Sequence, residues 1–312
     1  MDSSRGSWPT FSRRAAIAVG ALAAAPALSA HAFNLPETPP PDPLKRLDTA
    51  RRLTVEVSID GEGPYPFLVD TGASTSVISA DLVAARGLKV GGQTNLHSIT
   101  GVQAVETVVV DEVGVGRRIR RHLTMTVLPA ENLEASGILG LDWLGSQGLL
   151  LDFAAQKMRV GAGLPYRDGR TVTVPIDMRQ NGLSLLRGGV PGGSALVFLD
   201  TGSTTTVGNM ALLELAQDNR AIISDWTDVA LRSVTGQVFN GRLATLKLLR
   251  MGDIRLRNVP VVFGPVHTFR YWGIDEGPAI LVGSDVMRAF DSVSLDFARN
   301  QVHFRVHDTR GA

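Results

Sequence analysis

The sequence contains no cysteine. This absence excludes disulfide bonds, thiolate nucleophiles and sulfur-based zinc sites, and it leaves the redox compartment open. An excess of charge is also missing, since 31 Lys and Arg residues face 30 Asp and Glu residues. No overall field therefore attracts nucleic acid, and we expect no nucleic-acid partner. Neither a His-Glu-x-x-His motif nor a Gly-x-Ser-x-Gly elbow occurs, so we predict no metal and no cofactor.

Aromatic residues are few, with 11 Phe, 4 Trp and 3 Tyr beside 33 Gly and 16 Pro. Together with many Val, Leu and Thr residues, this composition favours a turn-rich β protein over a helical one. A chain of 312 residues is long enough for two domains with separate cores.

The first 32 residues have the three parts of an export signal. Arg13 and Arg14 precede an Ala-rich apolar segment, and Ala30-His31-Ala32 fits a cleavage site. We predict a twin-arginine-like signal peptide over 1–32 and an exported protein, periplasmic or secreted; Ala16 and Ala18 depart from the usual pattern and leave ordinary secretion open.

The alternative is an uncleaved anchor, but the apolar run is shorter than the roughly 20 residues that a span needs, so we expect no membrane span in the mature chain. The Pro-rich segment that follows predicts an extended leader over 33–50.

The tripeptide Asp-Thr-Gly occurs twice, as Asp70-Thr71-Gly72 in FLVDTGASTSVIS and as Asp200-Thr201-Gly202 in VFLDTGSTTTVGN. Average composition gives roughly 0.1 copies in a chain of this length. Each Asp follows an apolar run, which places it at the end of a buried strand, before a turn through Gly. Two adjacent carboxylates cannot easily both ionise, so they share a proton and act as acid and base on one water. The alternative is a pair of structural strand-end turns.

Further segments repeat in the same order. Ser98-Ile99-Thr100-Gly101 returns 135 residues later as Ser233-Val234-Thr235-Gly236, Ile138-Leu139-Gly140 returns 143 residues later as Leu281-Val282-Gly283, and Asp152-Phe153 returns 144 residues later as Asp296-Phe297. These anchors predict an internal duplication, with lobes over 51–166 and 167–308.

The two stretches Leu68 to Thr75 and Phe198 to Thr205 resemble the signature of the pepsin and retroviral-protease class of aspartic proteases. The resemblance implies an all-β fold of two tandem retropepsin-like lobes, forming a pepsin-like bilobal protease with short helices. It also implies a catalytic dyad and catalytic-loop support. The dyad is Asp70 and Asp200; the supporting residues are Thr71, Gly72, Ser74, Thr201, Gly202 and Ser203.

The turns at Thr100-Gly101 and Thr235-Gly236 lie where a retroviral protease carries its flap. Because each half has one, the chain resembles a retroviral-protease dimer fused into one polypeptide. A fused pair has no need to dimerise, so we expect a monomer.

The two halves differ in ways that predict separate roles. Ala73 follows the first triplet and Ser203 the second, so we predict that a Ser203 hydroxyl makes Asp200 the more acidic carboxyl. The longer loop from Pro265 to Pro278 carries Phe269, Tyr271 and Trp272. We expect these aromatics either to line the cleft and select apolar substrate side chains or to pack beneath the loop.

Two further patterns receive structural interpretations. Asp142 and Asp285 match between the repeats and stand beside short helices, where an acidic residue is usually a cap. The basic run at 117–121 is interpreted as a solvated hairpin turn, with an anionic partner as the alternative.

The sequence as a whole predicts an aspartic endopeptidase that acts on peptides or unfolded proteins. Two alternatives remain open at this point: a catalytically silent protein that binds peptides or envelope components on the same fold, and a hydrolase of a non-protein amide.

Overall fold

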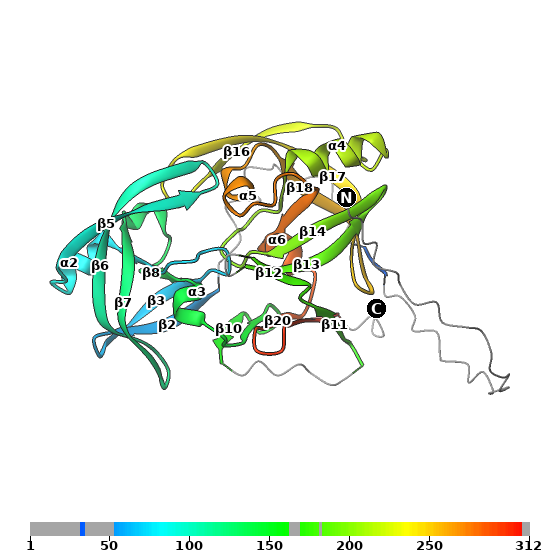
Figure 1. Ribbon diagram of the computed structural model, residues 1–312. Helices are drawn as coiled ribbons and strands as arrows, with labels where there is room; N and C mark the ends of the chain where they lie inside the picture. The colour runs from blue at the N-terminus through cyan, green and yellow to red at the C-terminus, as the bar shows by residue number, and fades with distance from the viewer. Residues whose placement is uncertain (1–31, 35–52, 162–168, 181–182, 308–312) are drawn as a thin grey trace, which may run out of the picture.

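The computed structural model describes residues 32–34, 53–161, 169–180 and 183–307. The described chain is built mainly from strands with a few short helices (Figure 1), which confirms the all-β prediction. The predicted signal peptide up to residue 31 and residues 35–50 of the predicted leader lie outside the described residues. No helix in the described ranges is long and apolar enough to cross a membrane.

The N-terminal lobe is a seven-stranded sheet in the order β2-β3-β8-β4-β7-β6-β5. A further pairing of β2 with β6 closes it into a barrel-like ring. Its strands are β2 (Thr54–Ile59), β3 (Glu62–Val69), β4 (Val77–Ser79), β5 (Val90–Ser98), β6 (Gly101–Val115), β7 (Arg118–Leu128) and β8 (Gly137–Leu139). The helices are α2 (Ala80–Ala85), the 3-10 turn η1 (Ala130–Asn132) and α3 (Leu141–Leu144).

The C-terminal lobe repeats this strand order as β13-β14-β19-β15-β18-β17-β16, closed by the pairing of β13 with β17. Its strands are β12 (Met178–Gln180), β13 (Leu183–Val190), β14 (Gly193–Leu199), β15 (Val207–Gly208), β16 (Thr227–Arg232), β17 (Val238–Met251), β18 (Ile254–Phe263) and β19 (Ala279–Val282). Its helices are α4 (Met210–Asp218), α5 (His267–Tyr271) and α6 (Ser284–Met287). The strand β1 (Ala32–Asn34) adds to this sheet, parallel to β18.

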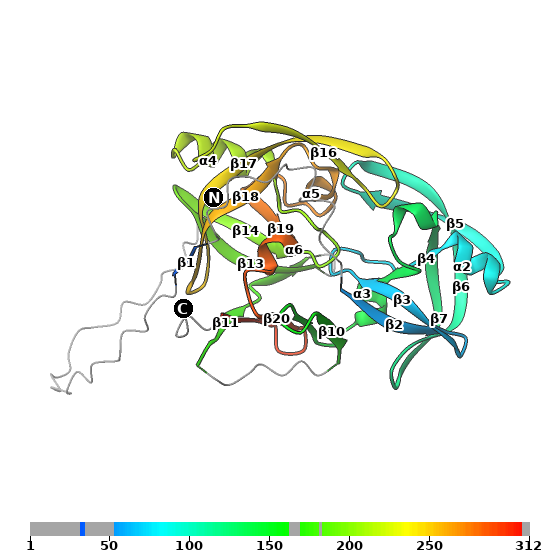
Figure 2. The ribbon, with the colours of Figure 1, turned by 180° about the vertical axis from the view of Figure 1, so that it is seen from behind.

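A third sheet takes strands from both halves of the chain, in the order β10-β9-β20-β21-β11. The first half supplies β9 (Leu149–Asp152) and β10 (Lys157–Val160); the second supplies β11 (Thr171–Pro175), β20 (Ser292–Asp296) and β21 (Gln301–Arg305). It lies below the two lobes in Figures 1 and 2. The strands β9 and β10 of the first half are thus part of a sheet shared by both halves.

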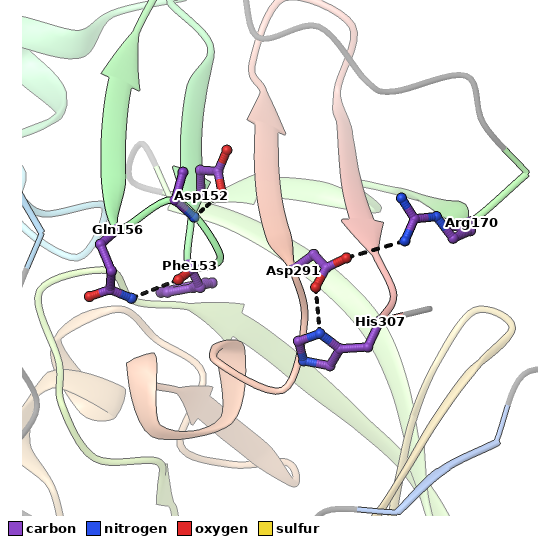
Figure 3. A network of polar contacts seen from close by, with 7 residues as sticks. Asp152, Phe153, Gln156, Arg170, Asp291 and His307 are labelled. Carbon is purple, nitrogen blue, oxygen red and sulfur yellow. Dashed lines mark hydrogen bonds and ion pairs between the residues drawn. The ribbon is translucent and has the colours of Figure 1, made fainter. Parts of the chain in front are cut away.

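Polar contacts at the strand ends hold this shared sheet together (Figure 3). Asp291, just before β20, lies 3.5 Å from Arg170 and also accepts a hydrogen bond from His307. The carbonyl of Asp291 accepts the N–H of Phe153, at 2.9 Å. The β9–β10 hairpin of the first half is therefore attached directly to the start of β20.

Alternating burial explains why these segments form strands. In β2 the side chains of Val55, Val57 and Ile59 are buried and those between them are not, the period of a half-buried strand. The strands that lead to the two Asp residues differ, because their last three residues are all buried between neighbouring strands.

Two local expectations need correction. The stretch Pro265 to Pro278, expected to be a loop, contains α5.

The basic run is not simply a solvated turn. Arg118 lies over the Trp143 ring, 5.3 Å from its centre, and Arg120 donates to the Trp143 carbonyl at 3.2 Å. These guanidinium groups contact the last carbonyls of α3, where positive charge is favourable.

Candidate active site

The structure brings Asp70 and Asp200 together at the boundary between the lobes. Asp70 follows β3 and its N–H donates to the Leu139 carbonyl at 2.9 Å; Asp200 follows β14 and donates to the Val282 carbonyl at 3.0 Å. β3 and β8 are parallel, as are β14 and β19, so each acidic loop leaves its lobe at an equivalent point. The predicted apolar-apolar-Gly segments are therefore the strands that hold the two acidic loops.

Thr71 and Thr201 connect the two loops through four hydrogen bonds. The N–H of Thr71 donates to Thr201 Oγ1 at 3.1 Å, and the N–H of Thr201 donates to Thr71 Oγ1 at 3.2 Å. Each hydroxyl then donates to a carbonyl of the opposite lobe: Thr71 to Leu199 at 2.6 Å, and Thr201 to Val69 at 2.7 Å. The relative position of the two carboxylates is thus fixed by side chains that cross between the lobes.

Gly72 and Gly202 allow a close approach between the loops. A Cβ atom on Gly202 would lie 2.2 Å from Asp70 Cγ, and one on Gly72 would lie 2.9 Å from Asp200 Oδ2. Each carboxylate therefore packs against the glycine of the opposite lobe, where no other residue fits. Each glycine N–H also donates to the Asp of its own loop, Gly72 at 2.7 Å and Gly202 at 2.9 Å.

The charge state of the pair differs from our prediction. Burial, the negative charge of Asp70 and a hydrogen bond with Asp70 raise the pKa of Asp200 well above its ordinary value. The Ser203 hydroxyl does not stabilise ionised Asp200, because it donates to the Thr205 carbonyl at 2.7 Å; only the Ser203 N–H reaches Asp200, at 3.1 Å. The prediction that the Ser203 hydroxyl makes Asp200 more acidic is therefore wrong.

A second pair of carboxylates supports the acidic loops from behind. Asp142 accepts the N–H and hydroxyl of Ser76, at 2.9 and 2.6 Å, and the N–H of Trp143 at 2.7 Å. Burial raises the pKa of Asp142, although the hydrogen bonds from Ser76 oppose this effect.

Asp285 repeats the arrangement in the other lobe, accepting from the N–H and hydroxyl of Thr206 at 3.0 and 2.7 Å and from the N–H of Val286 at 2.8 Å. The cap interpretation covers only the bonds to Trp143 and Val286; the larger role is to tether the loops. The signal for it was present, since a hydroxyl residue stands six positions after each Asp of the triplets.

A cavity of about 560 Å³ lies over the two carboxylates. Both acidic loops line it, and so do the ends of β5 and β16 and one side of α5. Ser74 is exposed along its wall. Its volume is in the range of ligand sites.

The two predicted flap turns meet each other above this cavity. Thr100 ends the turn between β5 and β6, and Thr235 and Gly236 lie in the turn between β16 and β17. Thr100 Oγ1 donates to Gln237 at 2.7 Å and lies 3.2 Å from Ser233 Oγ. Sequence reasoning missed Gln237, because nothing in its position indicates a contact with the other half.

The flap turns also exchange their apolar residues. Ile99, from the N-terminal flap, packs against a core cluster of the C-terminal lobe, and Val234, from the C-terminal flap, packs against one of the N-terminal lobe. Gly101 has a positive φ of 147° and Gly236 one of 80°, conformations that favour glycine at both turns. The flaps are therefore closed in this structure, each over the opposite lobe.

The aromatic residues of the long loop divide between the two roles that we expected. Phe269 is fully buried beneath the loop, so it packs rather than lines the cavity. Trp272 is buried too but contributes to the cavity wall, and Tyr271 lines the mouth with 45% of its surface exposed. Tyr271 stacks on His97 of β5 with ring centres 3.7 Å apart.

Comparison with known proteins supports the N-terminal half of this picture. Residues 55–146, from β2 to just past α3, match the family model of the gag-polyprotein putative aspartyl protease. No curated protein matches the chain. The matched region contains the first triplet and its flap, and the second lobe repeats its strand order. The chain thus consists of two tandem retropepsin-like lobes.

Proposed function

We propose that the protein is an aspartic endopeptidase whose nucleophile is a water molecule activated between Asp70 and Asp200. One observation carries this proposal: two carboxylates from different lobes lie together at the base of a cavity, in a position fixed by Thr71 and Thr201, and Asp70 helps to raise the pKa of Asp200. An ionised carboxylate beside a protonated one supplies a base and an acid at a single point.

The mechanism follows from the charge states of the pair. The ionised carboxylate of the pair accepts a proton from the water, whose oxygen attacks the carbonyl carbon of the peptide bond. The protonated carboxyl donates to the carbonyl oxygen, which would otherwise carry the developing negative charge. The tetrahedral intermediate then collapses as the protonated carboxyl gives its proton to the leaving amine and the other carboxylate takes a proton from a hydroxyl of the intermediate, so the dyad again holds one proton.

The proposed substrate is an extended peptide held between the flaps and the acidic loops. β5 and β16 line the cavity with their last residues and can pair with the backbone of such a peptide. Tyr271 and Trp272 form part of the wall and would favour apolar side chains on that side. We further propose that the chain is exported, on the basis of its signal-like first 32 residues, and acts as a monomer.

The test is a digest of unfolded mixed proteins by the chain from Phe33 onward, from about pH 4 to pH 7.5, the range in which a carboxyl dyad usually works. We expect wild type to cleave and Asp200→Asn to lose activity, because Asn cannot donate and then recover the proton. Asp218→Asn, at the exposed end of α4, is the matched control and should cleave normally.

The same digest examines side-chain selection. Tyr271→Ala and Trp272→Ala should lower the share of cleavages beside apolar residues, and cleavage profiles identical to wild type would contradict that part of the proposal. Binding of peptides without cleavage by the folded wild-type chain would instead favour the silent binding protein.

A further inference from the structure

The N-terminal flap is joined to the C-terminal lobe by a pair of histidines. His97 lies near the end of β5, and His267 is the first residue of α5. His97 Nδ1 and His267 Nε2 are 3.0 Å apart, the distance of a hydrogen bond, and the two rings are within 11° of parallel. One imidazole must present N–H and the other a bare nitrogen, so this contact depends on the protonation of both rings.

The contacts around the pair show what it holds in place. The backbone N–H of His267 donates to the Ile99 carbonyl at 3.1 Å, and the Ile99 side chain packs against the C-terminal core cluster that includes Val266 and Trp272. The Tyr271 ring stacks on His97, with ring centres 3.7 Å apart. The flap turn is thus attached to α5 through the imidazole pair, the ring stack and one backbone hydrogen bond. All three contacts are made by residues between His97 and Ile99.

We propose that His97 and His267 form a latch that keeps the N-terminal flap closed over the cavity at neutral pH and releases it when both imidazoles are protonated. This inference concerns access to the cavity, so it goes beyond the proposed hydrolysis and does not depend on it.

The proton balance gives the direction of the effect. With no proton or one proton added, the facing nitrogens still form N–H···N; with two added, both nitrogens carry hydrogen and the bond is lost. In the closed flap, burial and then the charge of His267 lower the pKa of His97 below its ordinary value of 6.5. In an open flap the His97 ring is in water, where its pKa lies near that ordinary value. Opening therefore takes up protons, and the closed flap is favoured above about pH 6.5 and disfavoured below it.

The other charged groups around the pair do not replace this effect. On β6, the residue opposite His97 is Val102. On α5, Arg270 is directed toward Asp275, 3.6 Å away, and its side chain is 79% exposed. The remaining titratable groups of the cavity wall are Asp70, Asp200, Glu134, Arg232 and Tyr271. In the described part of the chain, neither imidazole forms a salt bridge with a carboxylate.

The C-terminal flap provides an internal comparison. By the repeat, Arg232 occupies the position of His97, directly before the Ser of the turn. An Arg side chain keeps its charge at all pH values of interest, so the second flap has no equivalent of the latch. Access to the cavity is therefore controlled by pH from one side only.

The latch can be tested without measuring catalysis. Because the chain has no cysteine, Val102→Cys and Glu276→Cys provide two unique sites for spin labels. Val102 is exposed beside the N-terminal flap turn and Glu276 is exposed in the loop after α5. Distances between the labels are measured from pH 7.5 to pH 4.5 in an Asp200→Asn background, which removes substrate turnover and the shared proton of the dyad.

We expect a single short distance at pH 7.5 and a second, longer one that gains population on acidification, with the ratio of open to closed rising about tenfold per pH unit below pH 6, where one proton is taken up. In His97→Gln and, separately, in His267→Gln, the ratio of open to closed should change less than twofold between pH 7.5 and pH 4.5. His122→Gln is the matched control, since His122 is exposed in the β6–β7 hairpin, and it should behave like wild type.

Two results would overturn the latch. One is an unchanged distance in the wild-type pair of labels across the whole pH range. The other is the same pH dependence in both histidine variants as in wild type, which would assign the motion to other groups. The labelled protein could show the expected motion while the protein with Asp200 intact fails to cleave other proteins. That result would support the latch and contradict only the proposed endopeptidase activity.

Discussion

The hydroxyl of Thr201 is predicted to contribute strongly to stability, because it serves both lobes at once. In Thr201→Val the shape of the side chain is kept, but the bonds to the Val69 carbonyl and from the Thr71 N–H are lost. Both of those backbone groups are buried and have no access to water in exchange. Leaving a buried donor or acceptor unsatisfied costs roughly 1–3 kcal/mol, so two of them lower the free energy of unfolding by about 2–6 kcal/mol.

The assay compares urea unfolding of wild type, Thr201→Val and Thr201→Ser, followed by tryptophan fluorescence. Ser keeps the hydroxyl and loses only a methyl group, so it should cost about 1 kcal/mol. The Val variant should also lower kcat on the order of 100-fold, the effect of an error of about 1 Å in the position of reacting groups. If Val and Ser variants unfold at the same urea concentration, the cross-lobe hydrogen bonds do not stabilise the pair of loops.

Two further predictions concern the carboxylates. Because the pKa of Asp200 is raised in the folded protein, wild type loses stability as pH rises above about 3.8, where the unfolded chain ionises this group and the folded protein does not. Asp200→Asn should therefore unfold at a higher urea concentration than wild type at pH 7 and at the same concentration near pH 3. A constant difference at both pH values would contradict the raised pKa of Asp200. Asp142→Ala should lower the free energy of unfolding by about 3 kcal/mol or more, because it leaves Ser76 and the Trp143 N–H without their acceptor. Asp81→Ala on the exposed side of α2 should stay within about 1 kcal/mol, and equal losses in the two variants would argue against a tethering role for Asp142.

Much of the architecture could be predicted from the sequence because the two halves carry the same local signals. A triplet after an apolar run specifies a strand and a tight turn, and its repetition predicts two equivalent lobes. The positions of Asp70 and Asp200 follow directly from this pattern. Their catalytic role remains a prediction.

Other features depend on contacts between distant residues, which a single sequence does not contain. The direction of the Ser203 hydroxyl is set by the nearby Thr205 carbonyl, and the sequence suggested only that a hydroxyl was available. The exchange of Ile99 and Val234 between lobes arises from the way the two flaps cross. The pairing of His97 with His267 joins residues 170 positions apart and has no signal in their local sequence.

The shared sheet limits how this molecule can move. Strands β9 and β20 pair in continuous register from Leu149 with Leu295 to Asp152 with Ser292, so one ladder of hydrogen bonds joins the two halves. A hinge that separated the lobes would have to break this ladder and the threonine contacts above it together. We therefore expect any opening of the cavity to occur at the two flaps, while the shared sheet and the threonine contacts hold the two carboxylates at a fixed separation.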